Sequence, residues 1–167
     1  MSDEPNSAGD ADEPRFRDRL RLEIPRAIFD AMIAHAERES PLECCGLLGA
    51  VRGAIDSIYP LRNEDQSRVR YTADRRDLIS AVRAIRESRG DIGAIYHSHP
   101  STAPIPSRVD LAENYYGDTP RIIVSLASGK AEVRAWRLGE GCFDEIALSV
   151  GEDGGSSSAV VESSSSM

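Results

Sequence analysis

The sequence predicts one α/β domain in which a central β-sheet is sandwiched between helices. Short apolar runs rich in β-branched residues, typical of buried strands, alternate with longer segments whose apolar residues recur at helical spacing. Such an alternation favours the packing of helices against a sheet. A chain of 167 residues is also long enough to enclose one substantial hydrophobic core.

The first half of the domain is expected to hold two helices among three strands. Pro25, whose fixed φ suits a first helical turn, opens a helix that runs to about Glu37. A second helix begins at Asp74 or Asp77, and Gly90 stops it. The three strands are expected at Leu20–Ile24, Gly46–Val51 and Ile55–Leu61.

The second half is expected to be mostly strand. The apolar run Ile92–Tyr96 is typical of a buried strand, and Pro100 ends the extended segment that follows it. Ser107 has the side chain of a helix N-cap, so a short helix should begin there. Three further strands are expected near Arg121–Leu126, Ala131–Leu138 and Phe143–Ser149.

The formal net charge of -8 comes from the two ends of the chain. Residues 1–14 include five acids and no bases, and residues 151–167 include three acids and no bases. We therefore expect an acidic disordered tail over residues 1–18, a domain over 19–150 and a Gly/Ser-rich disordered tail over 151–167. Because acids and bases balance in the domain, a nucleic-acid partner is not expected.

The sequence has no pattern typical of export or membrane insertion. The N-terminal residues lack a basic region followed by an apolar one, and no run approaches the roughly 18 apolar residues of a membrane span. The three cysteines form no CxxC pair, which disfavours a zinc ribbon and favours reduced thiols. We expect a cytoplasmic protein with no membrane partner.

The most informative pattern for function is the pair His97 and His99 at the end of a buried run. Side chains two residues apart on a strand project to the same side, so the two imidazoles can share one ion. Seven residues separate His99 from Ser107, and Asp110 lies one turn into the expected helix. Two histidines and an aspartate are suitable ligands for one zinc ion, and a fourth position would remain for water.

A hydrolytic zinc site also needs a proton acceptor, and Glu43 is the candidate. It directly precedes a segment typical of a buried strand, where a carboxylate is rare without a partner. Each of these candidate residues also has a purely structural interpretation. Ser107 and Asp110 match a helix capping box, Glu43 can be a carboxylate satisfied by backbone donors, and His35 is expected to be a packing residue.

Taken together, Glu43, His97-Ser98-His99, Ser107 and Asp110 resemble the signature of the JAMM (MPN-plus) zinc metalloproteases. Pro41–Gly49 resembles the first core strand of the bacterial and archaeal branch, and the similarity runs from about residue 22 to about residue 150. The resemblance implies the MPN (JAB) fold, a mixed β-sheet sandwiched by helices with cytidine-deaminase-like layering.

The resemblance also implies a chemistry. It suggests a peptidase or isopeptidase that hydrolyses the amide bond after the C-terminal Gly-Gly of a ubiquitin-like or sulfur-carrier protein of the β-grasp type. One Zn²⁺ held by His97, His99 and Asp110 would activate water, with Glu43 as the general base and Ser107 as a hydrogen-bond donor to the oxyanion.

The length of the segment after Asp110 narrows the class of substrate that is expected. Family members that cut ubiquitin chains usually carry a longer insertion there, whereas only Leu111–Pro120 precedes the next expected strand, so a small carrier is the better match. Two alternatives stay open: a non-catalytic MPN scaffold and a RadC-like JAB domain. The strand after Glu43 and the lack of a helix-hairpin-helix region speak against the RadC-like protein.

Overall fold

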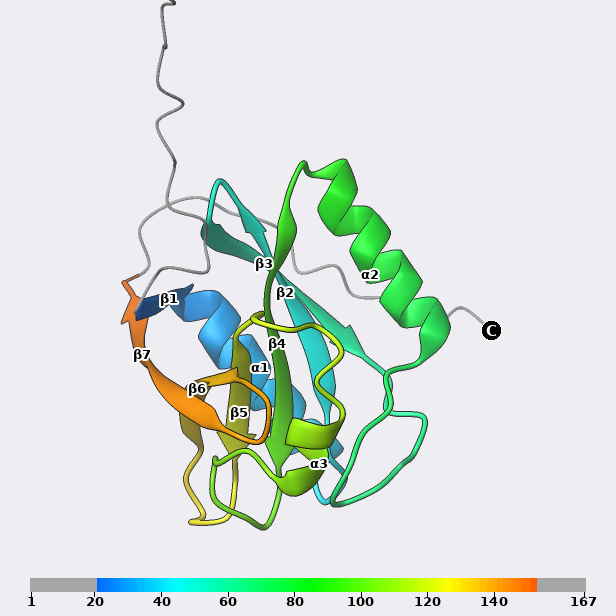
Figure 1. Ribbon diagram of the computed structural model, residues 1–167, viewed down its shortest axis with the longest axis vertical. Coiled ribbons are helices and arrows are strands. Elements are labelled where there is room, and N and C mark those ends of the chain that lie inside the picture. The colour runs from blue at the N-terminus through cyan, green and yellow to red at the C-terminus, as the bar shows by residue number, and fades with distance from the viewer. Residues whose placement is uncertain (1–20, 153–167) are drawn as a thin grey trace, which may run out of the picture.

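The computed structural model describes residues 21–152 (Figure 1). The tail predicted over residues 1–18 and almost all of the tail predicted over 151–167 lie outside the described residues. Gly151 itself is the last residue of a strand, so that strand runs one residue past the predicted boundary at residue 150.

Seven strands form one mixed sheet in the order β1-β7-β6-β5-β4-β2-β3. The pairs β1/β7 and β4/β5 are parallel, and the other neighbouring strands are antiparallel. The strands are β1 (Arg21–Pro25), β2 (Cys45–Val51), β3 (Ala54–Leu61), β4 (Asp91–His99), β5 (Arg121–Ser125), β6 (Glu132–Leu138) and β7 (Phe143–Gly151).

Helices cover both faces of the sheet, which confirms the predicted α/β sandwich. Helix α1 (Arg26–Glu39) lies behind the sheet in Figure 1, and α2 (Arg75–Glu87), to the right of β2 and β4 in that view, packs against the other face. The short α3 (Arg108–Ala112) follows β4 on the same side as α2. The expected strands and helices are therefore all present, with ends that differ by one or two residues.

Strand β4 shows how the two faces differ. Ala94 and Tyr96 pack in the core under α1, whereas Ile95 packs with Ala81 and Ile85 of α2. Because side chains alternate along a strand, His97 and His99 continue the face of Ile95. The predicted histidine pair is thus brought to the α2 side of the sheet, where α3 follows.

Two of the element ends that differ from the prediction have a clear physical reason. Pro25 is the last residue of β1, paired with Gly151, and α1 begins only at Arg26. Helix α2 ends at Glu87, and the left-handed residue after it is Arg89, with a φ of 56°, rather than Gly90. Glycine is needed at position 90 because an added Cβ would lie 2.6 Å from the Ala50 carbonyl oxygen.

No helix within residues 21–152 is long and apolar enough to cross a membrane. All three cysteines are free, as predicted. Cys44 and Cys45 are buried, which agrees with thiols that pack as small apolar groups, and Cys142 is exposed.

Candidate metal and catalytic site

His97 and His99 lie at the carboxyl end of β4 with their rings turned toward one another. Their Nε2 atoms are 3.2 Å apart, and both side chains are buried. The Nδ1 atom of His99 lies 2.8 Å from the Ala103 carbonyl oxygen, which can only accept a hydrogen bond. His99 therefore carries a hydrogen on Nδ1, which leaves Nε2, on the side of His97 and Asp110, as its ligand atom for a metal ion.

Asp110 is brought to the histidines by the first turn of α3. Its Oδ1 lies 3.1 Å from Nε2 of His97, and its Oδ2 lies 3.5 Å from Nε2 of His99. Ser107 caps the helix: its hydroxyl accepts from the Asp110 amide at 3.2 Å, and its own amide donates to Asp110 Oδ2 at 2.6 Å. The predicted capping box is present, and it holds the carboxylate that faces the histidines.

The three side chains fit a tetrahedral metal ion. Their ligand atoms all lie within 4.8 Å of one another. Ligands about 2.0 Å from a tetrahedral zinc ion are about 3.3 Å apart. The two Nε2 atoms are 3.2 Å apart, and each of them lies 3.1 or 3.5 Å from one of the two Asp110 oxygens, which is close to that spacing. The donor set of two neutral imidazoles and one carboxylate is also one that zinc prefers.

The protonation states of two of these groups suit metal binding. Burial lowers the pKa of His97 despite its contact with Asp110, so its imidazole is neutral at physiological pH. Burial alone would raise the pKa of Asp110, but hydrogen bonds with the two histidines hold it well below its usual range. The pKa of His99 is raised, because its bonds to Asp110 and Ala103 outweigh the effect of burial. A metal ion would compete with a proton at that nitrogen.

Glu43 lies two residues before β2 and is buried at the same site. Two hydrogen bonds with the segment after β3 fix the backbone of Glu43. Its amide donates to the Ser67 carbonyl at 2.8 Å, and its carbonyl accepts from the Asn63 side-chain amide at 3.1 Å. These hydrogen bonds hold the backbone and do not involve the carboxylate. Burial raises the pKa of Glu43 to about 8, with His99 lowering it and Asp110 raising it. In the register of β2 and β4, Cys45 pairs with His97 and the Cys44 carbonyl accepts from the Ser98 amide, so Glu43 lies near His99.

Several residues that position the site were not predicted from the sequence. Trp136 donates its indole N–H to the Pro104 carbonyl at 2.8 Å, and Ser125 donates to the Thr102 carbonyl at 2.6 Å. These two bonds tie the loop between β4 and α3 to strands β5 and β6. That loop carries the carbonyl group that orients His99, so its anchoring fixes a metal-facing imidazole.

Tyr71 is a further residue missed by the sequence reasoning. Its ring lies over His97, with ring centroids 5.0 Å apart and an interplanar angle of 32°. Nδ1 of His97 has no hydrogen-bond partner among the described residues. His97 is therefore held by packing against Tyr71 and by its Nε2 contacts.

His35, in contrast, is a packing residue as predicted: it lies on α1 and bonds the Tyr96 hydroxyl at 2.8 Å on the opposite face.

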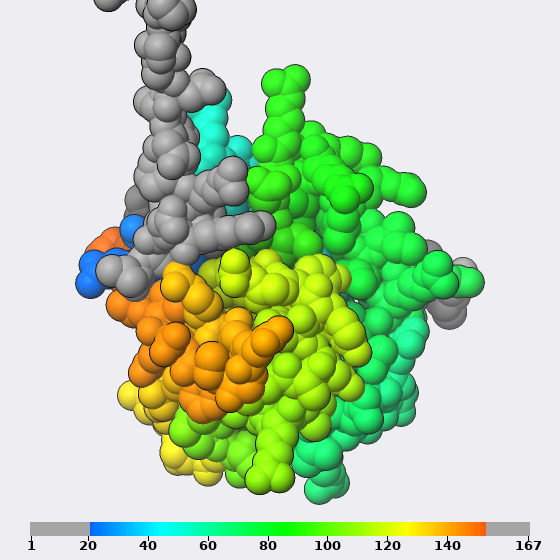
Figure 2. Space-filling view, viewed as in Figure 1, coloured from blue at the N-terminus to red at the C-terminus, as the bar shows by residue number. Residues whose placement is uncertain are grey.

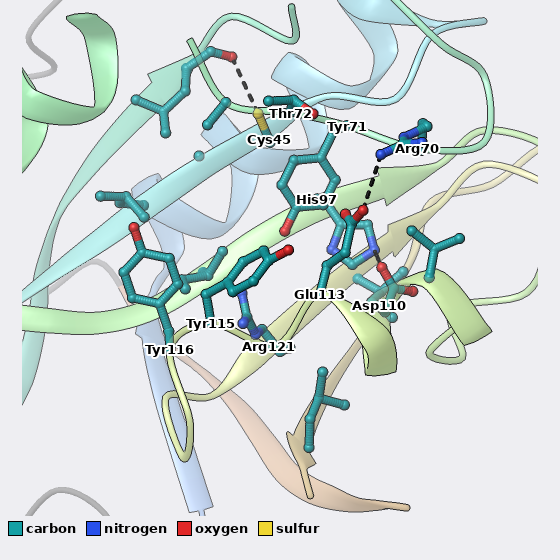
Figure 3. A pocket seen from close by; sticks show the side chains of 18 of the residues that line it. Cys45, Arg70, Tyr71, Thr72, His97, Asp110, Glu113, Tyr115, Tyr116 and Arg121 are labelled. Atoms are coloured by element: carbon teal, nitrogen blue, oxygen red, sulfur yellow. Dashed lines mark hydrogen bonds and ion pairs between the residues drawn. The ribbon is translucent and has the colours of Figure 1, made fainter. Parts of the chain in front are cut away.

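A cavity of about 480 Å³ opens beside the proposed ligands (Figure 3). His97 and Asp110 form one side of it, and much of the remaining wall is apolar, including Leu47, Leu61, Ile95, Ile123 and Leu138. Arg70 and Glu113 pair across its edge at 3.0 Å. In the space-filling view the blue-green residues after β3 and the yellow-green residues around α3 form adjoining parts of one surface (Figure 2).

Comparisons with known proteins place these features in a family context. Residues 25–139 match the family described as prokaryotic homologs of the JAB domain. A protein of Mycobacterium tuberculosis named "CysO-cysteine peptidase" is 31% identical over 134 residues, which cover 78% of this chain and 92% of that protein. A Thermus thermophilus protein named "Probable TtuB-protein conjugate cleaving protease" is 36% identical over 132 residues, covering 78% and 84%. A Haloferax volcanii "Desampylase" is 28% identical over 137 residues, covering 78% and 96%.

Solved structures show the same fold. A solution structure of a protein from Desulfitobacterium hafniense matches with a TM-score of 0.71 and 28% identity, over 79% of this chain and 94% of that one. A JAB1/MPN domain protein from Archaeoglobus fulgidus matches with a TM-score of 0.53 over 78% and 97% of the two chains. At 18% identity, the second likeness concerns the fold alone.

Proposed function

Because the chain belongs to the prokaryotic JAB branch of the JAMM/MPN family, we propose that it is a zinc-dependent peptidase or isopeptidase. The observation that carries the proposal is the convergence of His97, His99 and Asp110 next to the buried Glu43. The names of the related peptidases support hydrolysis in preference to the non-catalytic scaffold.

His97, His99 and Asp110 would hold one zinc ion. When bound, the ion supplies Lewis acidity and lowers the pKa of both a water molecule and the nearby Glu43. Glu43 accepts the proton of the attacking water and transfers it to the leaving amine. Burial raises the carboxylate pKa to about 8, and the ion would lower it toward neutrality, where a residue exchanges protons in both directions most effectively.

Ser107 has the remaining role in this scheme. Its hydroxyl oxygen accepts from the Asp110 amide, so the hydroxyl hydrogen is available for another acceptor. That hydrogen stabilises the negative charge that develops on the carbonyl oxygen during amide hydrolysis. One side chain thus caps α3 and serves the reaction.

The proposed substrate is a conjugate of a small ubiquitin-like or sulfur-carrier protein, cleaved after its C-terminal Gly-Gly. The relatives named for CysO-cysteine and TtuB conjugates support this class. The short connection from α3 to β5 also supports it, because residues 113–120 leave no space for a long additional binding element.

The test uses the full chain and a β-grasp carrier that ends in Gly-Gly followed by a short extension. Cleavage is followed by intact mass and zinc content by elemental analysis. We expect the wild type to bind one zinc ion and release the extension, and Glu43→Gln to keep the zinc and lose hydrolysis. Glu39→Gln, which changes an exposed glutamate at the end of α1, is the matched control. A protein that holds zinc but cleaves no Gly-Gly conjugate would contradict the proposal.

A further inference from the structure

Arg121 is a buried cation without an acidic partner. Only 5% of its surface is exposed, and its Nε atom has no hydrogen-bond partner among the described residues. One terminal nitrogen donates to Asn114 at 2.8 Å, but no carboxylate of residues 21–152 lies within ion-pair distance. Burying a charge without a counter-ion opposes folding, because the charged group loses its hydration. Such a residue therefore requires an explanation other than stability.

The place of Arg121 in the sheet brings it to the proposed active site. It is the first residue of β5 and pairs with Ile95, while His97 pairs with Ile123 two residues further along. Side chains two residues apart share a face, so Arg121 projects on the same face as the two histidines. It lines the cavity together with His97 and Asp110, and its guanidinium lies 5.8 Å from the Tyr116 ring (Figure 3).

The other arginine of this cavity is already neutralised. Arg70 pairs with Glu113 at 3.0 Å and with Asp65 at 3.2 Å. Arg121 consequently carries the uncompensated positive charge in a mostly apolar cavity of about 480 Å³. An apolar wall combined with one cation matches a ligand that has an apolar body and one negative group.

From these observations we propose that Arg121 binds the carboxylate of the leaving group, in a subsite that receives an amino acid released from the Gly-Gly end of the carrier. This inference rests on the proposed hydrolysis. The glycines before the cleaved bond have no side chains to fill the cavity, and their own carboxyl group is tied up in the amide. The residue after the bond can supply both an apolar side chain and a free carboxylate, whereas a lysine within a protein has no carboxylate next to its ε-amine.

The guanidinium fork matches a carboxylate in a bidentate arrangement, which lysine does not reproduce. Arg121 is accordingly a specificity-determining residue. It should favour conjugates of free amino acids over conjugates of protein lysines.

The test compares two synthetic peptides that end in Gly-Gly-Leu, one with a free carboxylate and one with a carboxamide. We expect the wild type to cleave the carboxylate peptide with a kcat/KM at least tenfold higher. Arg121→Gln should lower that value at least tenfold and change the value for the carboxamide less than threefold. Arg121→Lys keeps the charge and loses the guanidinium fork. Its kcat/KM for the carboxylate peptide should lie between those of the wild type and Arg121→Gln. Arg26→Gln, on the exposed surface of α1, is the matched control and should keep the wild-type ratio.

A second measurement does not depend on turnover. The same peptides are titrated calorimetrically into Glu43→Gln, with and without Arg121→Gln. Tighter binding of the carboxylate that disappears with Arg121→Gln supports the inference even if no peptide is cleaved, in which case the proposed hydrolysis alone fails. Equal kcat/KM values for both peptides in the wild type, or equal Kd values in Glu43→Gln, would overturn it. Both comparisons use proteins with Arg121 intact, so they remain decisive if the Arg121 variants do not fold.

Discussion

The Asp110 carboxylate, which faces the two histidines, also accepts a hydrogen bond from the Ser107 backbone amide. The distance from this amide nitrogen to Oδ2 is 2.6 Å. The capping interaction and the ligand position are therefore not alternatives. The first turn of α3 orients the carboxylate, and the capped carboxylate in turn fixes the start of the helix. A metal ligand held in this way loses little conformational entropy when it binds an ion.

Asp110→Asn should remove most of the metal affinity. The amide keeps the shape of the side chain but loses the negative charge that complements a dication. We expect zinc affinity to fall by more than the 10–100-fold that is typical for loss of an outer hydrogen-bond partner. Competition with a zinc-binding dye measures the affinity. Asp144→Asn, an exposed change on β7, is the control and should keep one zinc ion per chain. Undiminished affinity in Asp110→Asn would contradict the ligand assignment.

Ser107 has two proposed roles that two substitutions can separate. Ser107→Ala removes the hydroxyl and the cap, which should cost about 1 kcal/mol of stability, whereas Ser107→Gly removes the hydroxyl but should cost only a few tenths of a kcal/mol. If the hydroxyl stabilises the oxyanion, both variants should lose about 10²–10³ in kcat. Denaturant unfolding and initial rates give the two quantities. Wild-type kcat in Ser107→Gly would restrict the residue to capping.

Much of this architecture could be predicted because its signals are local. The alternation of β4 predicts that His97 and His99 share a face, and the Ser107-to-Asp110 spacing predicts both the helix start and the position of the third ligand. The family signature adds Glu43. The two histidines, Ser107 and Asp110 occur in short segments where spacing along the chain determines spacing in the fold.

The parts that could not be predicted depend on contacts between distant segments. Asn63 shows this: its side chain binds the carbonyls of Glu43 and Arg70 and accepts from the amides of Asp65 and Thr72. No periodic pattern marks such a residue, because its role arises only when the segment after β3 folds against the start of β2. Arg121 was missed for the same reason, since burial of a charge at a strand end is decided by the tertiary fold.

His35 should make the stability of the protein sensitive to acid. Burial lowers its pKa to about 4, with a smaller effect from Arg38, against 6.5 for an unperturbed histidine. At pH above 6.5 the residue is neutral in both the folded and the unfolded state. As the pH falls from 6.5 to 4, the unfolded state takes up a proton that the folded state does not, so the free energy of unfolding decreases by up to about 3 kcal/mol.

His35→Gln tests this sensitivity, because glutamine does not titrate and can still bond the Tyr96 hydroxyl. Urea unfolding at pH 7, 5.5 and 4.5 should show a smaller loss of stability in the variant than in the wild type. Glu37→Gln, an exposed change on the same helix, provides the comparison. Parallel pH profiles for the wild type and His35→Gln would show that other groups cause the acid sensitivity.

Gly46 should be essential for the packing of Tyr96. The two residues pair across β2 and β4, and a Cβ at position 46 would run into the Tyr96 ring. That ring cannot easily move, because it is fully buried and its hydroxyl bonds His35. Gly46→Ala should therefore destabilise the fold by about 1–3 kcal/mol, the usual cost of overpacking a core.

The cause can be isolated with a double-mutant cycle on Gly46→Ala and Tyr96→Leu, measured by urea unfolding. Because leucine does not reach the space occupied by the end of the tyrosine ring, Gly46→Ala should cost less in the Tyr96→Leu background, with a coupling of about 0.5–3 kcal/mol. If the cost of Gly46→Ala were the same in both backgrounds, the collision with Tyr96 would not be its origin. The loss would then reflect the backbone of β2 itself, and the glycine would serve strand geometry rather than the packing of the ring.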